Sequence, residues 1–143
     1  MTRAVLDDHL LRDLLSDDVS DSLARILVEH EPATTNLYYL RLCKSVVSAR
    51  GGRLTGSWPA ERRRALGETL IALPARIEVV PMQTLAFQMV ELADQHALST
   101  LGAEAVAAAV HLGAPLCVWD GNDGPAIRTA ANAAGADYQT LAR

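Results

Sequence analysis

Leu98-Ser-Thr-Leu-Gly-Ala-Glu-Ala-Val-Ala-Ala-Ala-Val-His-Leu-Gly-Ala-Pro-Leu-Cys-Val-Trp-Asp-Gly-Asn-Asp123 is the stretch that decides the fold. Ser99 or Thr100 can cap a helix by accepting a hydrogen bond from a free backbone N–H group. Gly113 suits the left-handed position just after a helix, and Pro115 keeps the helix from resuming. The stretch therefore predicts a helix that ends at Gly113, followed by a short strand.

The predicted helix is apolar on more than one side. Four apolar residues form one stripe along the helix, and three more make the neighbouring side apolar too. The stripe is Leu101, Ala105, Ala108 and Leu112, and the further residues are Val106, Ala109 and Val110. We therefore expect a helix that is packed between layers. The apolar run over residues 116–119 is typical of a strand covered on both faces in a parallel sheet. Asp120 follows at the carboxyl end of that strand, where open α/β sheets place their sites.

The rest of the chain alternates between strand and helix patterns. Strands are predicted over residues 4–6, 77–80 and 138–141, the last at a sheet edge, with residues 32–35 a break or a very short strand. Helices are predicted over 9–15, 22–30, 36–49, 61–73, 82–96 and from 123 or 124 to 134, with a loop over 53–59. Because helices separate the strands, we expect one domain over residues 1–143, a three-layer α/β/α fold with a mainly parallel sheet.

Composition limits the function classes. The 143 residues are half apolar and carry a formal net charge of −4, which argues against coating nucleic acid by bulk attraction. Aromatic residues make up 4%, too few for a base-stacking platform. Cys43 and Cys117 lie in apolar contexts and are interpreted as buried thiols in a reducing cytoplasm. The sequence shows no signal peptide and no apolar run long enough to span a membrane, so we expect a cytoplasmic location.

Two parts of the chain carry a family resemblance. Ser99, the Ala-rich helix, residues 112–115 and the strand ending at Asp120 resemble the C-terminal half of a PIN domain, and residues 4–7 resemble its opening strand and first acid. The resemblance implies a Mg²⁺- or Mn²⁺-dependent ribonuclease with three or four clustered carboxylates. Many small bacterial members are toxins of toxin–antitoxin pairs, and such toxins commonly dimerise.

The resemblance assigns the first family acid to Asp7. The same place after a strand also suits a helix N-cap, so both interpretations stay open. Asp8 occupies a position that the family usually gives to a small hydroxyl residue, and His9 follows it. The fourth family acid corresponds to Asp120, with Asp123 as a helper in the next turn or as a cap of the last helix. The candidate catalytic residues are thus Asp7, Asp120 and Asp123, with Asp7 and Asp120 as metal ligands.

The two central family acids are missing. The second corresponds to Arg41, and residues 32–60 contain no Asp or Glu at all. The third corresponds to Gly102. Glu104 is the nearest acid, but two residues along a helix is about 200° around it, so Glu104 is expected to point away and to form a surface pair with His111. Its use as a ligand is the alternative.

Two carboxylates without a cation would repel each other. We expect the guanidinium of Arg41 to replace the metal as the internal cation for Asp7 and Asp120, the alternative being an Arg41 exposed to solvent.

The predicted function is a PIN-like domain with a degenerate carboxylate cluster, weak or absent nuclease activity and an RNA- or protein-binding role. The alternative is an active Mg²⁺- or Mn²⁺-dependent endoribonuclease of the kind that serves as a toxin with an antitoxin-like partner. The middle third of the chain carries a group of basic residues, which would form a solvated face, line an RNA groove or contact an acidic partner. These residues are Arg41, Lys44, Arg50, Arg53 and Arg62 to Arg64.

Overall fold

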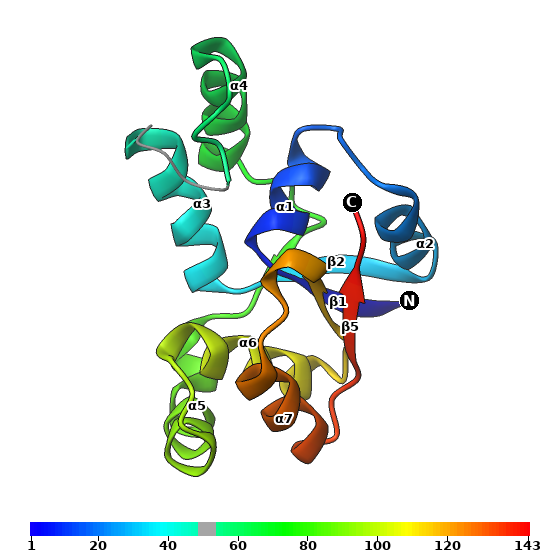
Figure 1. Ribbon diagram of the computed structural model, residues 1–143, viewed down its shortest axis with the longest axis vertical. Coiled ribbons are helices and arrows are strands. Elements are labelled where there is room, and N and C mark those ends of the chain that lie inside the picture. The colour runs from blue at the N-terminus through cyan, green and yellow to red at the C-terminus, as the bar shows by residue number, and fades with distance from the viewer. Residues whose placement is uncertain (49–53) are drawn as a thin grey trace.

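The computed structural model describes residues 1–48 and 54–143, and within them five parallel strands form one sheet (Figure 1). The strands are β1 (Thr2–Leu6), β2 (His30–Thr34), β3 (Glu78–Val79), β4 (Leu116–Trp119) and β5 (Tyr138–Leu141). Their order across the sheet is β3-β2-β1-β4-β5. Every pair of neighbours is parallel, so the helices between them serve as crossover connections.

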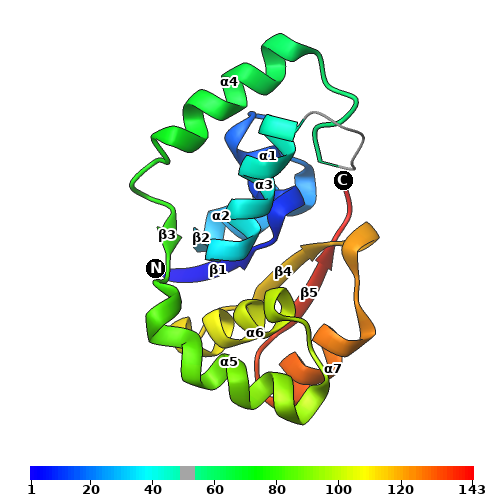
Figure 2. The same ribbon diagram turned by 90° about the vertical axis from the view of Figure 1, so that its left-hand side faces the viewer.

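Helices cover both faces of the sheet (Figure 2). They are α1 (Asp8–Leu15), α2 (Asp21–Glu29), α3 (Asn36–Ser48), α4 (Ala60–Ile71), α5 (Met82–His96), α6 (Thr100–Leu112) and α7 (Pro125–Ala133). Successive residues of β1 serve two cores, because side chains alternate along a strand. Ala4 and Leu6 pack with α1 to α4, whereas Val5 packs with α5 to α7. The predicted three-layer α/β/α fold is confirmed.

The deciding stretch folds as its residues predict. Ser99 caps α6, accepting a hydrogen bond at 3.2 Å from the backbone N–H of Gly102. Gly113 ends the helix with φ of 60°, and its N–H returns to carbonyls of the last turn. Residues 102–109 are all buried, so α6 is packed on several sides and holds β4 in the middle of the fold.

Several boundaries differ from the sequence prediction. Residues 32–34 of the predicted break belong to β2, a full strand next to β1. The predicted end of the third helix at Ala49, the glycine pair at 51–52 and the cations Arg50 and Arg53 lie outside the described residues. Among the residues that the structure describes, no helix has the length and apolar character needed to cross a membrane.

Candidate functional site

The carboxyl ends of β1 and β4 meet at one edge of the sheet. The strands pair in parallel with Leu6 opposite Cys117, and the backbone N–H of Asp7 donates to the Cys117 carbonyl at 3.1 Å. Residues 7–9 lead from β1 into α1, and a short 3₁₀ helix, η1 (Asp120–Asn122), follows β4. This edge therefore brings the first acid of the chain next to the turn that follows β4.

Asp7 is fully buried and caps α1. Its Oδ1 accepts from the backbone N–H of Leu10 at 2.9 Å. Its Oδ2 accepts from the backbone N–H of Trp119 at 3.0 Å and from Nδ2 of Asn122 at 3.1 Å. Both carboxylate oxygens thus hold structural hydrogen bonds, and Asp7 ties the start of α1 to the end of β4.

Asp8 and His9 are buried beside Asp7. Asp8 Oδ1 accepts from the backbone N–H of His9 at 2.9 Å and lies 3.2 Å from His9 Nδ1. Asp8 Oδ2 and His9 Nε2 are buried and have no hydrogen-bond partner among the described residues. Nε of Arg41 lies 3.4 Å from Asp8 Oδ2. The imidazole packs against Trp119, with 4.6 Å between the ring centroids.

The side-chain amide nitrogen of Asn122 lies at the centre of these groups. It is 3.1 Å from Asp7 Oδ2, 3.2 Å from Asp8 Oδ1 and 2.9 Å from His9 Nδ1. An amide nitrogen carries two hydrogens, so it donates to two of these three atoms at a time, and His9 Nδ1 accepts one only in the tautomer in which that nitrogen carries no hydrogen. Asp7, Asp8 and His9 each offer one ligand atom, and the three atoms lie within 4.8 Å of one another, so this group could hold a metal ion.

Burial and charge move the two carboxyl pKa values in opposite directions. Burial raises the pKa of Asp7 to about 6, and the charge of Asp8 adds to that rise against the hydrogen bonds that Asp7 accepts. Burial also acts to raise the pKa of Asp8, yet the hydrogen bond from His9 and the charge of Arg41 outweigh it and hold that pKa below its ordinary value. Asp8 is therefore the more acidic partner of this adjacent pair.

Arg41 lies at the cluster, but its position differs from both sequence-based interpretations. Its side chain is 52% exposed, and Asp8 is the carboxylate that it meets within ion-pair distance among the described residues. It approaches Asp8 from the solvent side, whereas the sequence predicted an ion pair with Asp7 and Asp120. Among the described residues, the side chain that donates a hydrogen bond to Asp7 is that of Asn122, at Oδ2.

Gly102 and Glu104 show what replaces the third family acid. A Cβ atom at Gly102 would lie 3.0 Å from Cγ1 of Ile127, so α7 fills the space that a carboxylate there would need. Glu104 is fully buried, and the expected surface pair with His111 is wrong. Its carboxylate accepts from the backbone N–H groups of Asn36 and Leu37 and from the Asn36 side chain, at 2.8 to 3.1 Å. Glu104 therefore anchors the N-terminus of α3, where carboxylates are favoured.

Asp120 and Asp123 lie outside the buried group. Both are exposed. Asp120 begins η1, and its side chain makes no hydrogen bond or ion pair with the described residues. Asp123 accepts from Arg128 at 3.0 Å and from the Tyr138 hydroxyl at 2.9 Å, and these hydrogen bonds lower its pKa. The structure thus joins Asp7 to Asp8, His9, Asn122 and Arg41, and leaves the two later acids at the surface.

Asn122 is the site residue that sequence reasoning missed. Its neighbours Gly121 and Gly124 made the segment look like a plain turn. The available signal was a hydrogen-bonding side chain just after a strand that ends beside Asp7.

Comparison of the sequence with protein-family models finds no match, and neither does comparison with curated proteins.

Proposed function

We propose that this chain is a PIN-like domain whose carboxylate cluster is closed by its own side chains, that its nuclease activity is weak or absent, and that it binds RNA at this edge of the sheet. The observation that carries the proposal is the amide nitrogen of Asn122, within 3.2 Å of one potential ligand atom on each of Asp7, Asp8 and His9. N–H groups of the protein thus point at the atoms that a cation would need.

The residues present fit a hydrated divalent ion poorly. Mg²⁺ prefers oxygen ligands and keeps several waters, which requires space around the carboxylates. Asn122 takes that space, and the positive charge of Arg41 lies 3.4 Å from Asp8. A bound metal would supply an activated water for phosphodiester attack. In this arrangement Asp7 instead accepts structural hydrogen bonds, and Asp8 faces a permanent cation.

A cation at the cluster supports RNA as the ligand. Arg41 lies 3.4 Å from Asp8, and Lys44 is exposed one helical turn further along α3. Arg and Lys side chains supply most contacts to nucleic-acid phosphates. The formal net charge of −4 confines such binding to a local patch. We therefore expect weak, salt-sensitive binding of single-stranded RNA through the α3 side of the cluster.

The second candidate is an active Mg²⁺- or Mn²⁺-dependent endoribonuclease that acts as a toxin with an antitoxin-like partner. It is favoured by the three ligand atoms of Asp7, Asp8 and His9 within 4.8 Å of one another. In that case Asn122 would have to leave its present hydrogen bonds for a metal to bind.

A single set of assays separates the two candidates. Fluorescence anisotropy with labelled single-stranded RNA in EDTA measures binding, and gel analysis of the same RNA with Mn²⁺ measures cleavage. We expect binding that weakens as salt rises and in the Arg41→Ala/Lys44→Ala double variant, with Arg25→Ala on α2 as the control. Mn²⁺-dependent cleavage that Asp7→Asn abolishes would establish the nuclease instead. RNA affinity that is the same in the double variant and the control would contradict RNA binding at this edge.

A further inference from the structure

The turn that carries Asn122 is held from outside the carboxylate cluster, through the residue that follows Asn122. Asp123 Oδ1 accepts from the Tyr138 hydroxyl at 2.9 Å, and Asp123 Oδ2 accepts from Nη2 of Arg128 at 3.0 Å. The Tyr138 oxygen in turn accepts from the backbone N–H of Gly124 at 3.3 Å. Because Tyr138 begins β5 and Arg128 lies in α7, both the sheet and the last helix hold this turn in place.

The other end of the turn is fixed by Gly121 and Trp119. A Cβ atom at Gly121 would overlap the indole ring of Trp119, so the turn lies directly against that ring and only glycine fits without moving it. The opposite contact of the indole is with His9, at 4.6 Å between the ring centroids. Asn122 therefore lies between two fixed points, one at Trp119 and the other at Asp123.

The contacts around Asp123 keep their donors and acceptors near neutral pH. Burial raises the pKa of Tyr138 to about 12, and the hydrogen bonds from Arg128 and Tyr138 lower the pKa of Asp123. Tyr138 thus stays a donor and Asp123 an acceptor. The Arg128 and Asp123 side chains are 44% and 39% exposed, and exposed ion pairs contribute little to the stability of a whole fold. Such contacts can fix a short turn and can break without unfolding the sheet.

We propose that Asp123, Tyr138 and Arg128 form a latch that keeps the Asn122 amide on the carboxylate cluster and so keeps divalent cations out of it. When the latch opens, η1 moves away and frees the carboxylate oxygens that Asn122 now contacts, which are the ligands that such cations prefer. Asp123 is a positioning residue in this arrangement, because it acts through Asn122. The inference rests on the proposed closure of the cluster by Asn122.

Calorimetric titration of the full chain with Mn²⁺ tests the latch. Tyr138→Phe removes the hydroxyl that joins Asp123 to Gly124, and we expect it to raise the Mn²⁺ affinity at least several-fold over the parent chain. Asp123→Ala should have the same effect, because it removes the acceptor of both Tyr138 and Arg128. Asp123→Asn keeps an acceptor oxygen for the Tyr138 hydroxyl and should change the affinity less.

The side-chain amide of Asn122 gives a second measurement, without metal. In EDTA, NMR should show that the Asn122 NH₂ hydrogens exchange with solvent at least several-fold faster in Tyr138→Phe than in the parent. Exchange of the backbone amides of β4 should stay at the parent rate, which separates a local opening of η1 from a loss of global stability.

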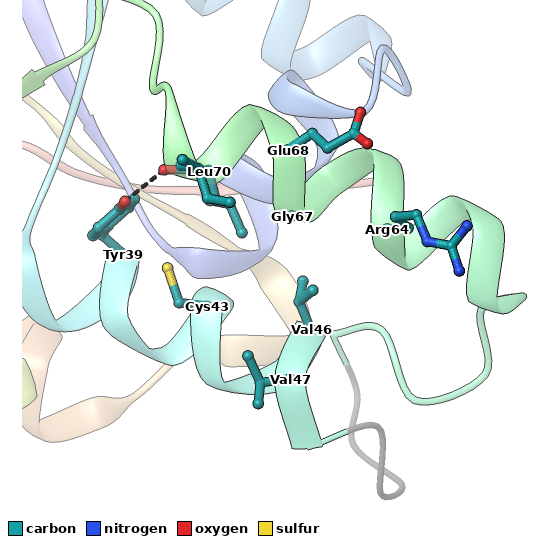
Figure 3. Close-up of a pocket in the computed structure, with 9 residues that line it drawn as sticks. Tyr39, Cys43, Val46, Val47, Arg64, Gly67, Glu68 and Leu70 are labelled. Atoms are coloured by element: carbon teal, nitrogen blue, oxygen red, sulfur yellow. Dashed lines mark hydrogen bonds between the residues drawn. The ribbon is translucent and has the colours of Figure 1, made fainter.

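Tyr39→Phe is the matched control for the loss of a tyrosine hydroxyl. The Tyr39 hydroxyl donates to the Leu70 carbonyl at 2.6 Å, in the contact between α3 and α4 (Figure 3). Its removal also deletes one hydrogen bond between two elements, but these elements do not hold η1. Tyr39→Phe should therefore leave the Mn²⁺ affinity and the exchange of the Asn122 amide at their parent values.

An Asn122→Ala background separates the latch from the closure on which it rests. Asn122→Ala should itself raise the Mn²⁺ affinity, and adding Tyr138→Phe should raise it no further. An equal rise on adding Tyr138→Phe to the parent and to Asn122→Ala would overturn the latch, since Tyr138 would then act without Asn122. If Asn122→Ala raises the affinity but Tyr138→Phe changes neither affinity nor exchange, the latch is wrong and the closure stands. An Asn122→Ala variant with the parent affinity would overturn both.

Discussion

The amide nitrogen of Asn122 lies 2.9 Å from Nδ1 of His9, although 113 positions separate the two residues in the chain. The contact exists because β1 and β4 are parallel neighbours and both end at the same edge of the sheet. It joins η1 to the first turn of α1 and supplies N–H groups to a pair of buried carboxylates. Asn122 is therefore the residue whose replacement most directly changes what the cluster can bind.

Asn122→Asp is expected to create a divalent-ion site and to lower the stability of the metal-free chain. The change replaces N–H donors by a third carboxylate beside Asp7 and Asp8, and like charges at such distances repel. We expect a loss of about 1–3 kcal/mol in EDTA, and a Mn²⁺-dependent rise in melting temperature larger than that of the parent chain. Thermal melts with and without Mn²⁺ and calorimetric titration measure both effects.

Asn122→Ala is the control for that experiment. It removes the donor without adding a ligand, so it should lose stability but respond less to Mn²⁺ than Asn122→Asp does. Equal metal responses in both variants would show that the position of Asn122 does not decide metal binding.

Arg41→Ala is expected to cost little stability, about 1 kcal/mol or less. Removing one side of a buried ion pair typically costs ~3–5 kcal/mol, but the Arg41 side chain is 52% exposed, and solvent screens such a pair. The pKa of Asp8 should rise in this variant, because Arg41 is one of the groups that hold it down. NMR titration of the Asp8 carboxyl follows the pKa, and urea unfolding gives the stability. Arg41→Lys should keep most of the effect on the pKa of Asp8. A loss of stability above ~3 kcal/mol for Arg41→Ala would contradict a solvent-screened Arg41–Asp8 pair.

The order of elements was predictable because local signals agree along the chain. Ser99, Gly113 and Pro115 specify where α6 starts and stops, and the run of residues 116–119 has the length and composition of a buried strand. Asp7 was correctly placed at the end of β1, and its capping role follows from the same position. Local chemistry of this kind depends on neighbours a few residues away, which the sequence shows directly.

The partners across the site were not predictable in the same way. The direction of Arg41 depends on how α3 packs against α1, and the burial of Glu104 depends on α3 starting against α6. Asn122 acquires its role only when η1 folds over α1. Each of these contacts joins segments far apart in the chain, so helical spacing alone could not reveal them.

Glu104→Ala is expected to destabilise the fold strongly, by about 3–5 kcal/mol. It would leave three hydrogen-bond donors at the start of α3 without their buried acceptor, including the backbone N–H groups of Asn36 and Leu37. Glu104→Gln keeps one acceptor oxygen and should lose less. Glu91→Ala, an exposed acid on α5, should stay within about 0.5 kcal/mol of the parent. Urea unfolding of the three variants gives the comparison, and a Glu104→Ala variant as stable as Glu91→Ala would contradict the anchoring role.

Asp7 and Asp8 contribute to stability in separate pH ranges. The pKa of Asp7 is raised to about 6 in the folded chain, so between about pH 4 and pH 6 the folded state binds more protons there than the unfolded state. This contribution to stability is present at low pH and is lost as the pH rises through about 6. The pKa of Asp8 is lowered, so its contribution is present at higher pH and is lost as the pH falls below about 4.

Asp7→Asn should therefore flatten the dependence of stability on pH between about 4 and 6. The parent chain should lose about 2–3 kcal/mol more than the variant across this window, the free-energy equivalent of a rise of about two pKa units. Asparagine also weakens the cap, because its NH₂ group faces the N–H donors of Trp119 and Asn122, so the slopes and not the absolute stabilities carry the comparison. Urea unfolding of both chains at a series of pH values measures the slopes. Other titrating groups are common to the two chains and cancel in the difference, so parallel curves would show that Asp7 keeps an ordinary pKa in the folded state.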